Sequence, residues 1–308
     1  MNRIGRFLRD QGTLAISITY LIRAVNNTQR FFITDYRYSI IFRCNLAKAY
    51  WAVGDVRQAI ALLEVTLADC ERVLGVEHPF TLTCRSDLAL AYKDAGDARL
   101  AILLFELIAA DYERLFGSDE PDTLILRSNL ASAYLESGEV ERATSMLETN
   151  LADCERVLGV DHPDTVSSRN ELAGACLESG DTEGAIPLFW AALADCERVL
   201  SANHTQAFWI RSNLASAYRA AGDVAQAKLM GEAVLADCDR VLGVKHVDYV
   251  KFRNNLAYTC LVSGDIERAI SLFEAALADG ERILDSESPI MRTIMANLRA
   301  AREAGNNY

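Results

Sequence analysis

Residues 127–168 read RSNLASAYLESGEVERATSMLETNLADCERVLGVDHPDTVSS, and this stretch decides the fold of the 308-residue chain. Its pattern recurs every 42 residues without insertion or deletion. The recurring residues include Gly54, Gly96, Gly138, Gly180, Gly222 and Gly264, and Ala59, Ala101, Ala143, Ala185, Ala227 and Ala269. A period of this length predicts a solenoid, in which each repeat covers the apolar face of its neighbour.

Each repeat predicts two helices. In the first, apolar and small residues recur at helical spacing, as in Leu130, Ala131 and Tyr134, and Gly138 is expected to end it. The second is expected from about residue 140 to Gly159. The turn that follows carries a proline, which suits the first turn of the next helix.

The four histidines all occupy this turn. They are His78, His162, His204 and His246. Because equivalent residues lie a whole repeat apart, they cannot converge on a metal, whose ligands lie ~2 Å away. We expect them to cap and pack the turn, and the sequence predicts no metal site.

Six full repeats span residues 43–294. Residues 1–42 fit the register weakly and predict a degenerate N-terminal repeat or cap, in which Asn26 and Asn27 should end the second helix early. Residues 295–308 form the end of a C-terminal capping helix and the tail. An aromatic cluster near the N-terminus covers the end of the core or forms a homodimer surface; its members are Phe31, Phe32, Tyr36 and Tyr38.

Composition excludes several classes of function. A net charge of −12 disfavours non-specific binding to nucleic acid or to anionic membranes, because both require a positive field. No apolar run reaches the ~18 residues of a transmembrane helix. Four of the eight cysteines, Cys70, Cys154, Cys196 and Cys238, share one repeat position, too far apart for disulfides. We therefore expect buried thiols and a cytoplasmic protein.

The pattern Leu–Ala–x–x–Tyr, then Gly, then Ala, resembles tetratricopeptide (TPR) repeats, whose usual unit is about 34 residues. The longer second helix, which ends in Leu-Gly-x-x-His-Pro-Asp-Thr, resembles the variant of kinesin light chains and of many actinobacterial repeat proteins. This resemblance covers residues 43–294 and implies a bacterial, all-α, right-handed α-solenoid of TPR helix pairs. No Gly-x-x-x-x-Gly-Lys phosphate loop occurs in the sequence, and we expect no cofactor.

One pair of charged residues recurs on every second helix. An aspartate is followed three residues later by an arginine, as in Asp153 and Arg156. This spacing allows a pair on one helix face. Because catalytic carboxylates would not recur once per repeat, we interpret these pairs as structural ties, and we assign no catalytic residue.

The resemblance also implies a binding surface, since first helices line the concave groove in this family. The residue before each Leu–Ala pair is expected to face the groove, and it is usually asparagine. An amide both donates and accepts hydrogen bonds, so a row of them can hold an extended peptide backbone. The predicted groove comprises Asn45, Lys48, Trp51, Asn129, Asn213, Arg219, Asn255 and Tyr258. The alternative is that these asparagines tie adjacent helices or cap locally.

The fourth repeat departs most from the pattern. Its row position is Glu171, and Pro187 falls inside its second helix. These departures indicate either sequence drift in a redundant array or a specialised pocket. The pocket would be formed by Glu171, Trp190, Phe208 and Trp209.

These features favour a non-enzymatic, cytoplasmic scaffold that binds an extended peptide or partner-protein segment. The runner-up is a solenoid that binds a small molecule around repeat four, as a sensor or an unusual enzyme. A third hypothesis is a module that self-associates through the N-terminal aromatic segment.

Overall fold

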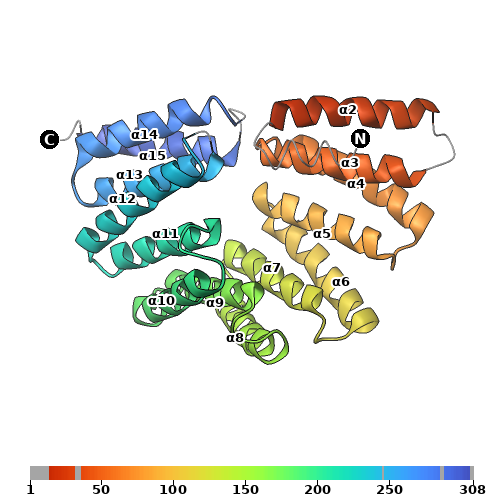
Figure 1. Cartoon of the computed structure of the whole chain (residues 1–308), viewed down its shortest axis with the longest axis horizontal. Coiled ribbons are helices and arrows are strands. Elements are labelled where there is room, and N and C mark those ends of the chain that lie inside the picture. The colour runs from red at the N-terminus through yellow and green to blue at the C-terminus, as the bar shows by residue number, and fades with distance from the viewer. Residues whose placement is uncertain (1–13, 32–35, 245, 285–287, 306–308) are drawn as a thin grey trace. The chain divides into compact units, whose positions relative to one another are not determined.

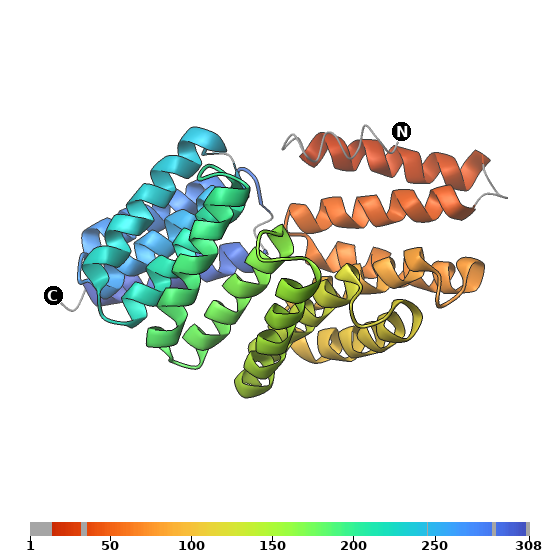
Figure 2. The same ribbon diagram turned by 60° about the horizontal axis from the view of Figure 1, so that its bottom comes forward.

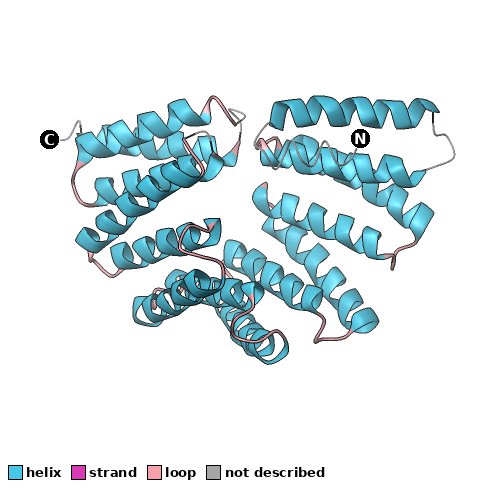
Figure 3. Ribbon diagram, in the orientation of Figure 1, coloured by secondary structure: helices cyan, strands magenta, loops and turns pink. Residues whose placement is uncertain are grey.

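A computed structural model describes residues 14–31, 36–244, 246–284 and 288–305. Within these ranges the chain forms helices and connecting loops without any strand (Figure 3). The chain divides into two compact units, residues 1–115 with 287–289 and residues 116–286 with 290–308. The all-α solenoid predicted from the sequence is confirmed.

Successive helices stack in chain order within each unit (Figures 1 and 2). The first unit holds α2 (Leu14–Phe31), α3 (Tyr36–Ala52), α4 (Val56–Leu74), α5 (Pro79–Asp94) and nearly all of α6 (Ala98–Phe116). The second holds α7 (Pro121–Ser137), α8 (Val140–Val157), α9 (Pro163–Glu178), α10 (Thr182–Val199), α11 (Thr205–Ala220), α12 (Val224–Val241), α13 (Val247–Val262), α14 (Ile266–Gly280) and α15 (Pro289–Gly305). First helices of the repeats are therefore the odd-numbered ones from α3.

The turn histidines cap the first helices, as predicted. The His162 Nδ1 atom accepts a hydrogen bond of 3.2 Å from the backbone N–H of Asp164, and Pro163 occupies the first turn. Equivalent bonds occur at His78, His204 and His246. Thr165 adds a 2.8 Å bond from its hydroxyl to the carbonyl of Gly159, which fixes the turn between α8 and α9.

The turns after the second helices α4, α6, α8, α10 and α12 require a left-handed backbone. Gly159 has φ 90°, and the N–H of His162 bonds to its carbonyl at 3.2 Å. Ser201 stands at the same position after α10, and it has φ 133° with the same bond from His204. Because a side chain disfavours this conformation, the fourth repeat carries backbone strain that glycine avoids elsewhere.

The recurring alanines lie where helices approach closely. Each is fully buried: Ala59, Ala101, Ala143, Ala185, Ala227 and Ala269. Around them pack larger side chains, such as Phe105 in the first unit and Phe189 and Phe273 in the second. At the C-terminal end, Leu298 and Ala301 of α15 pack against Phe273, so α15 covers the sixth repeat as predicted.

Ion pairs join the two helices of each full repeat. In repeat three, Asp153 accepts from Arg127 of α7 at 3.1 Å and from Arg156 of its own helix at 2.9 Å. The same arrangement occurs at Asp69, Asp111, Asp195, Asp237 and Asp279. The expected aspartate–arginine ties are confirmed, and each aspartate links two helices.

All eight cysteines are free thiols, and only Cys176 is partly exposed. Burial raises the pKa of Cys238 to about 11, which keeps this thiol protonated and unreactive. Cys44 and Cys84 come from different repeat positions, and their Sγ atoms lie 3.9 Å apart. The sequence analysis compared only cysteines that share one repeat position, so it did not predict this contact.

One prediction about the N-terminal region is wrong. Helix α2 does not end at Asn26 and Asn27 but continues to Phe31. Leu21, Ala24 and Val25 are buried against side chains of α3, so packing outweighs the weak helix propensity of asparagine. In the N-terminal aromatic cluster, Phe32 lies outside the described residues, and only the Tyr38 side chain is described; it is exposed.

Candidate functional site

The first helices of the second unit contact one another directly, α7 with α9, α9 with α11 and α11 with α13. Asparagines of the predicted row connect them. The Asn213 amide donates to the Asn170 Oδ1 atom at 3.2 Å, and the Asn255 amide donates to the Ser212 hydroxyl at 3.1 Å. Asn297 of α15, 42 residues after Asn255, bonds in the same way to Asn254, so asparagines at this repeat position tie adjacent repeats three times.

These ties leave most of each amide's hydrogen-bonding capacity unused. An asparagine amide has two N–H donors and an oxygen with two lone pairs, and each tie occupies one donor. Asn213 and Asn255 are half-buried, so each residue keeps part of its surface in contact with solvent. Asn129 on α7 is also half-buried and makes no side-chain hydrogen bond to another described residue. Glu171 is half-buried on α9 in the middle of the row.

The predicted residues of the first unit form contacts between α3 and α5. The Lys48 ammonium lies 2.8 Å from a carboxylate oxygen of Asp87, the row residue of the second repeat. The Trp51 indole donates to Asp94 at 2.6 Å. Asn45 is buried, and its amide donates to the carbonyl of Ile41 at 2.9 Å. Lys48 and Trp51 therefore connect neighbouring repeats, whereas the Asn45 bond stays within α3, which is a local contact of the kind that the alternative interpretation of the asparagines expects.

Arg219 has an unusual environment in the second unit. Its guanidinium lies 4.8 Å from the centre of the Tyr258 ring, and it donates to the Thr259 hydroxyl at 3.3 Å. No carboxylate within the described ranges forms an ion pair with it. Burial lowers the pKa of Arg219, yet an arginine stays charged at neutral pH. A charged group with a neutral environment is suited to binding an anionic or polar ligand.

A small recess lies beside this arginine. Its lining includes Ser212, Ser216, Asn255 and Thr259, together with Gly231 of α12. Hydroxyl and amide groups of α11 and α13 thus converge next to the Arg219–Tyr258 pair. The structure therefore brings together three of the predicted groove residues: Arg219, Asn255 and Tyr258.

The four residues of the alternative pocket point to different places. Trp190 is exposed, and its indole donates to the Tyr218 hydroxyl at 3.0 Å. Phe208 is fully buried in the core, whereas Trp209 packs edge-on against Phe252 at 4.8 Å. Trp209 and Tyr218 are nine residues apart on α11, which is about 13 Å along the helix. The structure does not bring Trp190 and Trp209 together.

Several contacts of these residues were not predicted from the sequence. The partners of the asparagines, Asn170, Ser212 and Asn254, stand immediately before row positions of the preceding repeats. Serine or asparagine occupies this position in repeats two to six, and that recurrence is a signal that could have revealed them. Lys251, whose ammonium lies 5.0 Å from the Trp209 ring centre, carries no comparable signal.

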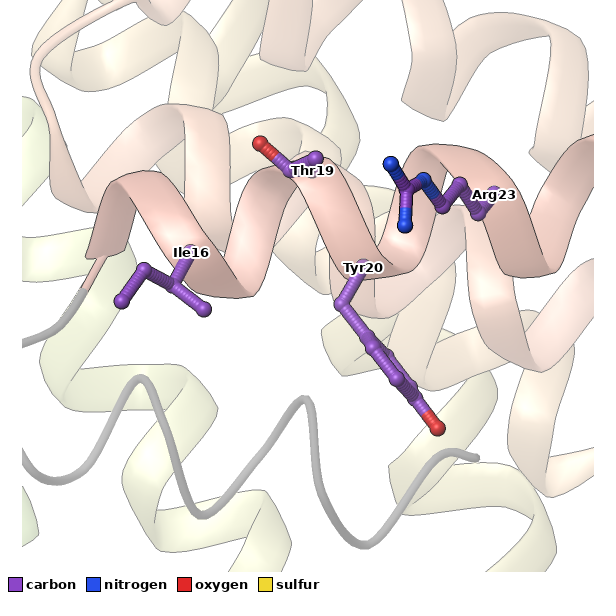
Figure 4. Close-up of a pocket in the computed structure, with 4 residues that line it drawn as sticks. All are labelled: Ile16, Thr19, Tyr20 and Arg23. Atoms are coloured by element: carbon purple, nitrogen blue, oxygen red, sulfur yellow. The ribbon is translucent and has the colours of Figure 1, made fainter.

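A separate open cavity lies on α2 in the first unit. Figure 4 shows its four described lining residues, Ile16, Thr19, Tyr20 and Arg23. All four side chains come from this single helix, and none belongs to the predicted groove. This cavity does not contribute to the asparagine row.

Other classes of site have little support among the residues described here. They include no group of three or more His, Cys, Asp or Glu side chains that could hold a metal ion. Nor does any helix in those ranges have the length and apolar character needed to cross a bilayer.

Two models of the tetratricopeptide repeat match the array, one at residues 43–114 and 122–194 and one at 209–248. A crystal structure from Podosopora anserina, described as a kinesin light chain with nearly identical TPR-like repeats, is 31% identical with a TM-score of 0.53. The match covers 64% of this chain and 93% of that chain. The chain belongs to the tetratricopeptide repeat family. Its TPR repeats are of the kinesin light chain type.

More distant TPR structures share the fold over a larger part of the chain. A Rap protein complexed with competence and sporulation factor is 12% identical with a TM-score of 0.65, and the match covers 94% of this chain and 80% of that one. The Rap conjugation gene regulator of plasmid pLS20, in complex with the Phr* peptide, is 12% identical with a TM-score of 0.62 and coverages of 91% and 72%. A search of curated proteins gives no match to this TPR chain.

Proposed function

We propose that this TPR protein is a non-enzymatic scaffold that binds an extended peptide, or an extended segment of a partner protein, along the first helices of its second unit. The observation that carries the proposal is the row of half-buried amides on α7, α11 and α13. Each of these residues is partly exposed, and its amide has donors and lone pairs beyond those used in the ties, to which the groups of a peptide backbone are complementary.

The spacing of the row favours an extended ligand. Asn129, Asn213 and Asn255 come from repeats three, five and six, so one ligand that contacts all three must span several first helices. An extended peptide covers up to ~3.3–3.6 Å per residue, so about twenty residues suffice. A compact metabolite would contact only neighbouring repeats.

Arg219 and Tyr258 add a specific contact at the α11–α13 end of this row. The guanidinium offers charged donors to a carboxylate or a carbonyl of the ligand. Tyr258 is 39% exposed, so its ring and hydroxyl remain accessible. Two Rap proteins with the same fold are complexed with the Phr* peptide and with competence and sporulation factor, which supports a peptide ligand here by analogy.

The free thiols support a reducing compartment, and we therefore propose that the protein acts in the cytoplasm. We also propose that the protein is bacterial, because its repeats resemble those of actinobacterial repeat proteins. Small-molecule binding around repeat four remains the second candidate, since Trp190 leaves 44% of its surface exposed on α10.

The proposal is tested by selection from a random peptide library displayed on phage against the purified chain. Selected peptides are then measured by fluorescence anisotropy against Asn129→Ala, Asn213→Ala and Asn255→Ala variants. Each substitution should weaken binding by ~0.5–1.5 kcal/mol, the usual net value of one hydrogen bond. Asn203→Ala, in the loop before α11, is the matched control and should leave affinity unchanged.

A second control separates binding from helix packing. Ser212→Ala removes the acceptor of the Asn255 tie but keeps the Asn255 amide, so it should lower stability slightly and preserve binding. If Ser212→Ala weakens binding as much as Asn255→Ala, the amides act only through packing. Undiminished affinity when all three asparagines are alanine would refute the peptide row, and loss confined to a Trp190→Ala variant would favour the local pocket.

A further inference from the structure

The fifth repeat lacks a large side chain at one position of its core. Gly231 lies inside α12, where each of the other full repeats has a leucine or a phenylalanine that is at most 1% exposed. These residues are Leu63, Phe105, Leu147, Phe189 and Phe273. Glycine weakens the interior of a helix and leaves core volume unfilled, so the stability of the fold does not account for this residue.

The small recess between α11 and α13 lies where that side chain is missing. Gly231 lines it, and it has room for about one water molecule. The Leu256 Cδ1 atom lies 3.0 Å from the place that a Cβ atom would take at residue 231, so even a methyl group there would fill the recess.

The recess opens onto the asparagine row. Its lining residues Ser216 and Asn255 are half-buried and therefore lie at its opening. Asn255 belongs to the row, and Ser216 follows Asn213 of the row by three residues, which places both on one face of α11. A ligand that lies along the row thus passes over the recess.

Two hydroxyl groups in the lining keep unused hydrogen-bonding capacity. Ser212 is 4% exposed, and its oxygen accepts a hydrogen bond from the Asn255 amide. Within the described ranges no group accepts the Ser212 hydroxyl proton, and the Ser216 hydroxyl forms no hydrogen bond to another residue. Because a buried hydroxyl without an acceptor is costly, the recess favours an occupant that accepts this proton.

We propose that the recess is a side-chain pocket of the peptide site and takes the hydroxyl group of a serine in the bound peptide. The ligand oxygen accepts the Ser212 proton, and the ligand hydroxyl donates to the Ser216 oxygen. This inference rests on the proposed function, because it adds a sequence requirement to the same site.

The size and the polarity of the recess select serine over other side chains. A serine hydroxyl has nearly the size of the water that the recess can hold, and like water it both donates and accepts. It can therefore displace that water and keep its hydrogen bonds. The methyl group of an alanine would leave the Ser212 proton without an acceptor, and leucine or phenylalanine exceeds the available space.

The peptide side of the contact is tested with the peptides selected on phage. They should share one serine, and replacing it by alanine should weaken binding to the wild-type chain about fivefold in fluorescence anisotropy, since one or two hydrogen bonds are lost. Replacing it by phenylalanine should weaken binding further. Selected peptides without a shared serine, or an alanine replacement that leaves the affinity unchanged, overturn the serine assignment.

The protein side is tested by filling the recess. Gly231→Ala should weaken binding of the serine peptide about fivefold and abolish the preference for serine over alanine, because neither peptide can then place a hydroxyl group in the recess. The urea denaturation midpoint should not fall, since alanine favours a helix interior more than glycine does. Ala233→Leu, on the exposed side of α12, is the matched control and should leave both affinities unchanged.

The outcomes separate this inference from the proposed function. If Gly231→Ala retains the wild-type preference for serine, the recess is not a side-chain pocket, even where the affinity falls through a change in packing. When Asn129→Ala and Asn213→Ala weaken binding but Gly231→Ala does not, the row stands and the pocket is wrong. Failure to select any binding peptide overturns both.

Discussion

Replacing Ser201 by glycine should stabilise the protein. Ser201 has φ 133° in the turn after α10, where the equivalent residues Gly75, Gly117, Gly159 and Gly243 also have positive φ. The backbone N–H of His204 bonds to the Ser201 carbonyl at 3.2 Å, the same distance as the bond from His162 to Gly159. The turn therefore imposes a glycine conformation on a residue with a side chain.

The expected magnitude follows from two opposing contributions. Holding a non-glycine residue in a sparsely populated backbone region costs ~1–3 kcal/mol, and glycine removes that cost. Glycine also makes the unfolded chain more flexible, which opposes folding by ~0.4–1 kcal/mol. The free energy of unfolding should therefore rise by about 1 kcal/mol in Ser201→Gly.

Urea denaturation followed by circular dichroism measures this change, with two controls. Ser201→Ala keeps the Cβ atom and should leave the free energy of unfolding within a few tenths of a kcal/mol of wild type. Gly159→Ser should destabilise by a similar ~1–2 kcal/mol, because a Cβ there meets nothing within 4 Å and the cost is purely conformational. If Ser201→Gly and Gly159→Ser both leave the midpoint unchanged, the turn carries no backbone strain and the reasoning is refuted.

Two further predictions concern stability. Ala227→Leu should destabilise by ~1–3 kcal/mol, because this fully buried alanine lies where helices approach closely, whereas Ala233→Leu on the exposed side of α12 should be nearly neutral in the same denaturation assay. Hydrogen bonds from Arg72 and from Arg43 hold the pKa of Asp69 below its usual value of 3.8, so the stability that Asp69 contributes is complete above that value and is lost as pH falls through its lowered folded-state pKa. Asp69→Asn should therefore lose less stability than wild type between neutral and acidic pH, and an identical acid dependence of the two midpoints would contradict the role of this tie.

Much of the fold could be predicted because the period repeats each local signal four to six times along the chain. The glycines that end helices, the histidine caps and the shared aspartate–arginine ties are local features, and each depends on residues within one repeat. Helix α2 was predicted less well, because its continuation through Asn26 and Asn27 depends on burial of Leu21 against α3. Tertiary packing of this kind is not visible in helix propensity.

The candidate site could be predicted only in part. The repeat register places Asn213 and Asn255 on first helices, but it cannot show that their amides bond to the preceding repeat. That contact depends on how closely first helices pack. The register likewise could not separate Trp190 from Trp209, because only the structure shows that one pairs with Tyr218 and the other with α13.

The central claim, that an extended peptide lies along the first helices of the second unit, is tested most directly by photo-crosslinking. A peptide selected from the random library carries a benzophenone amino acid at successive positions, and mass spectrometry identifies the crosslinked residues of the chain. We predict crosslinks on α7, α11 and α13 that move along the row as the benzophenone position changes. Crosslinks confined to one repeat, or to the second helices α8, α10 and α12, would contradict the claim.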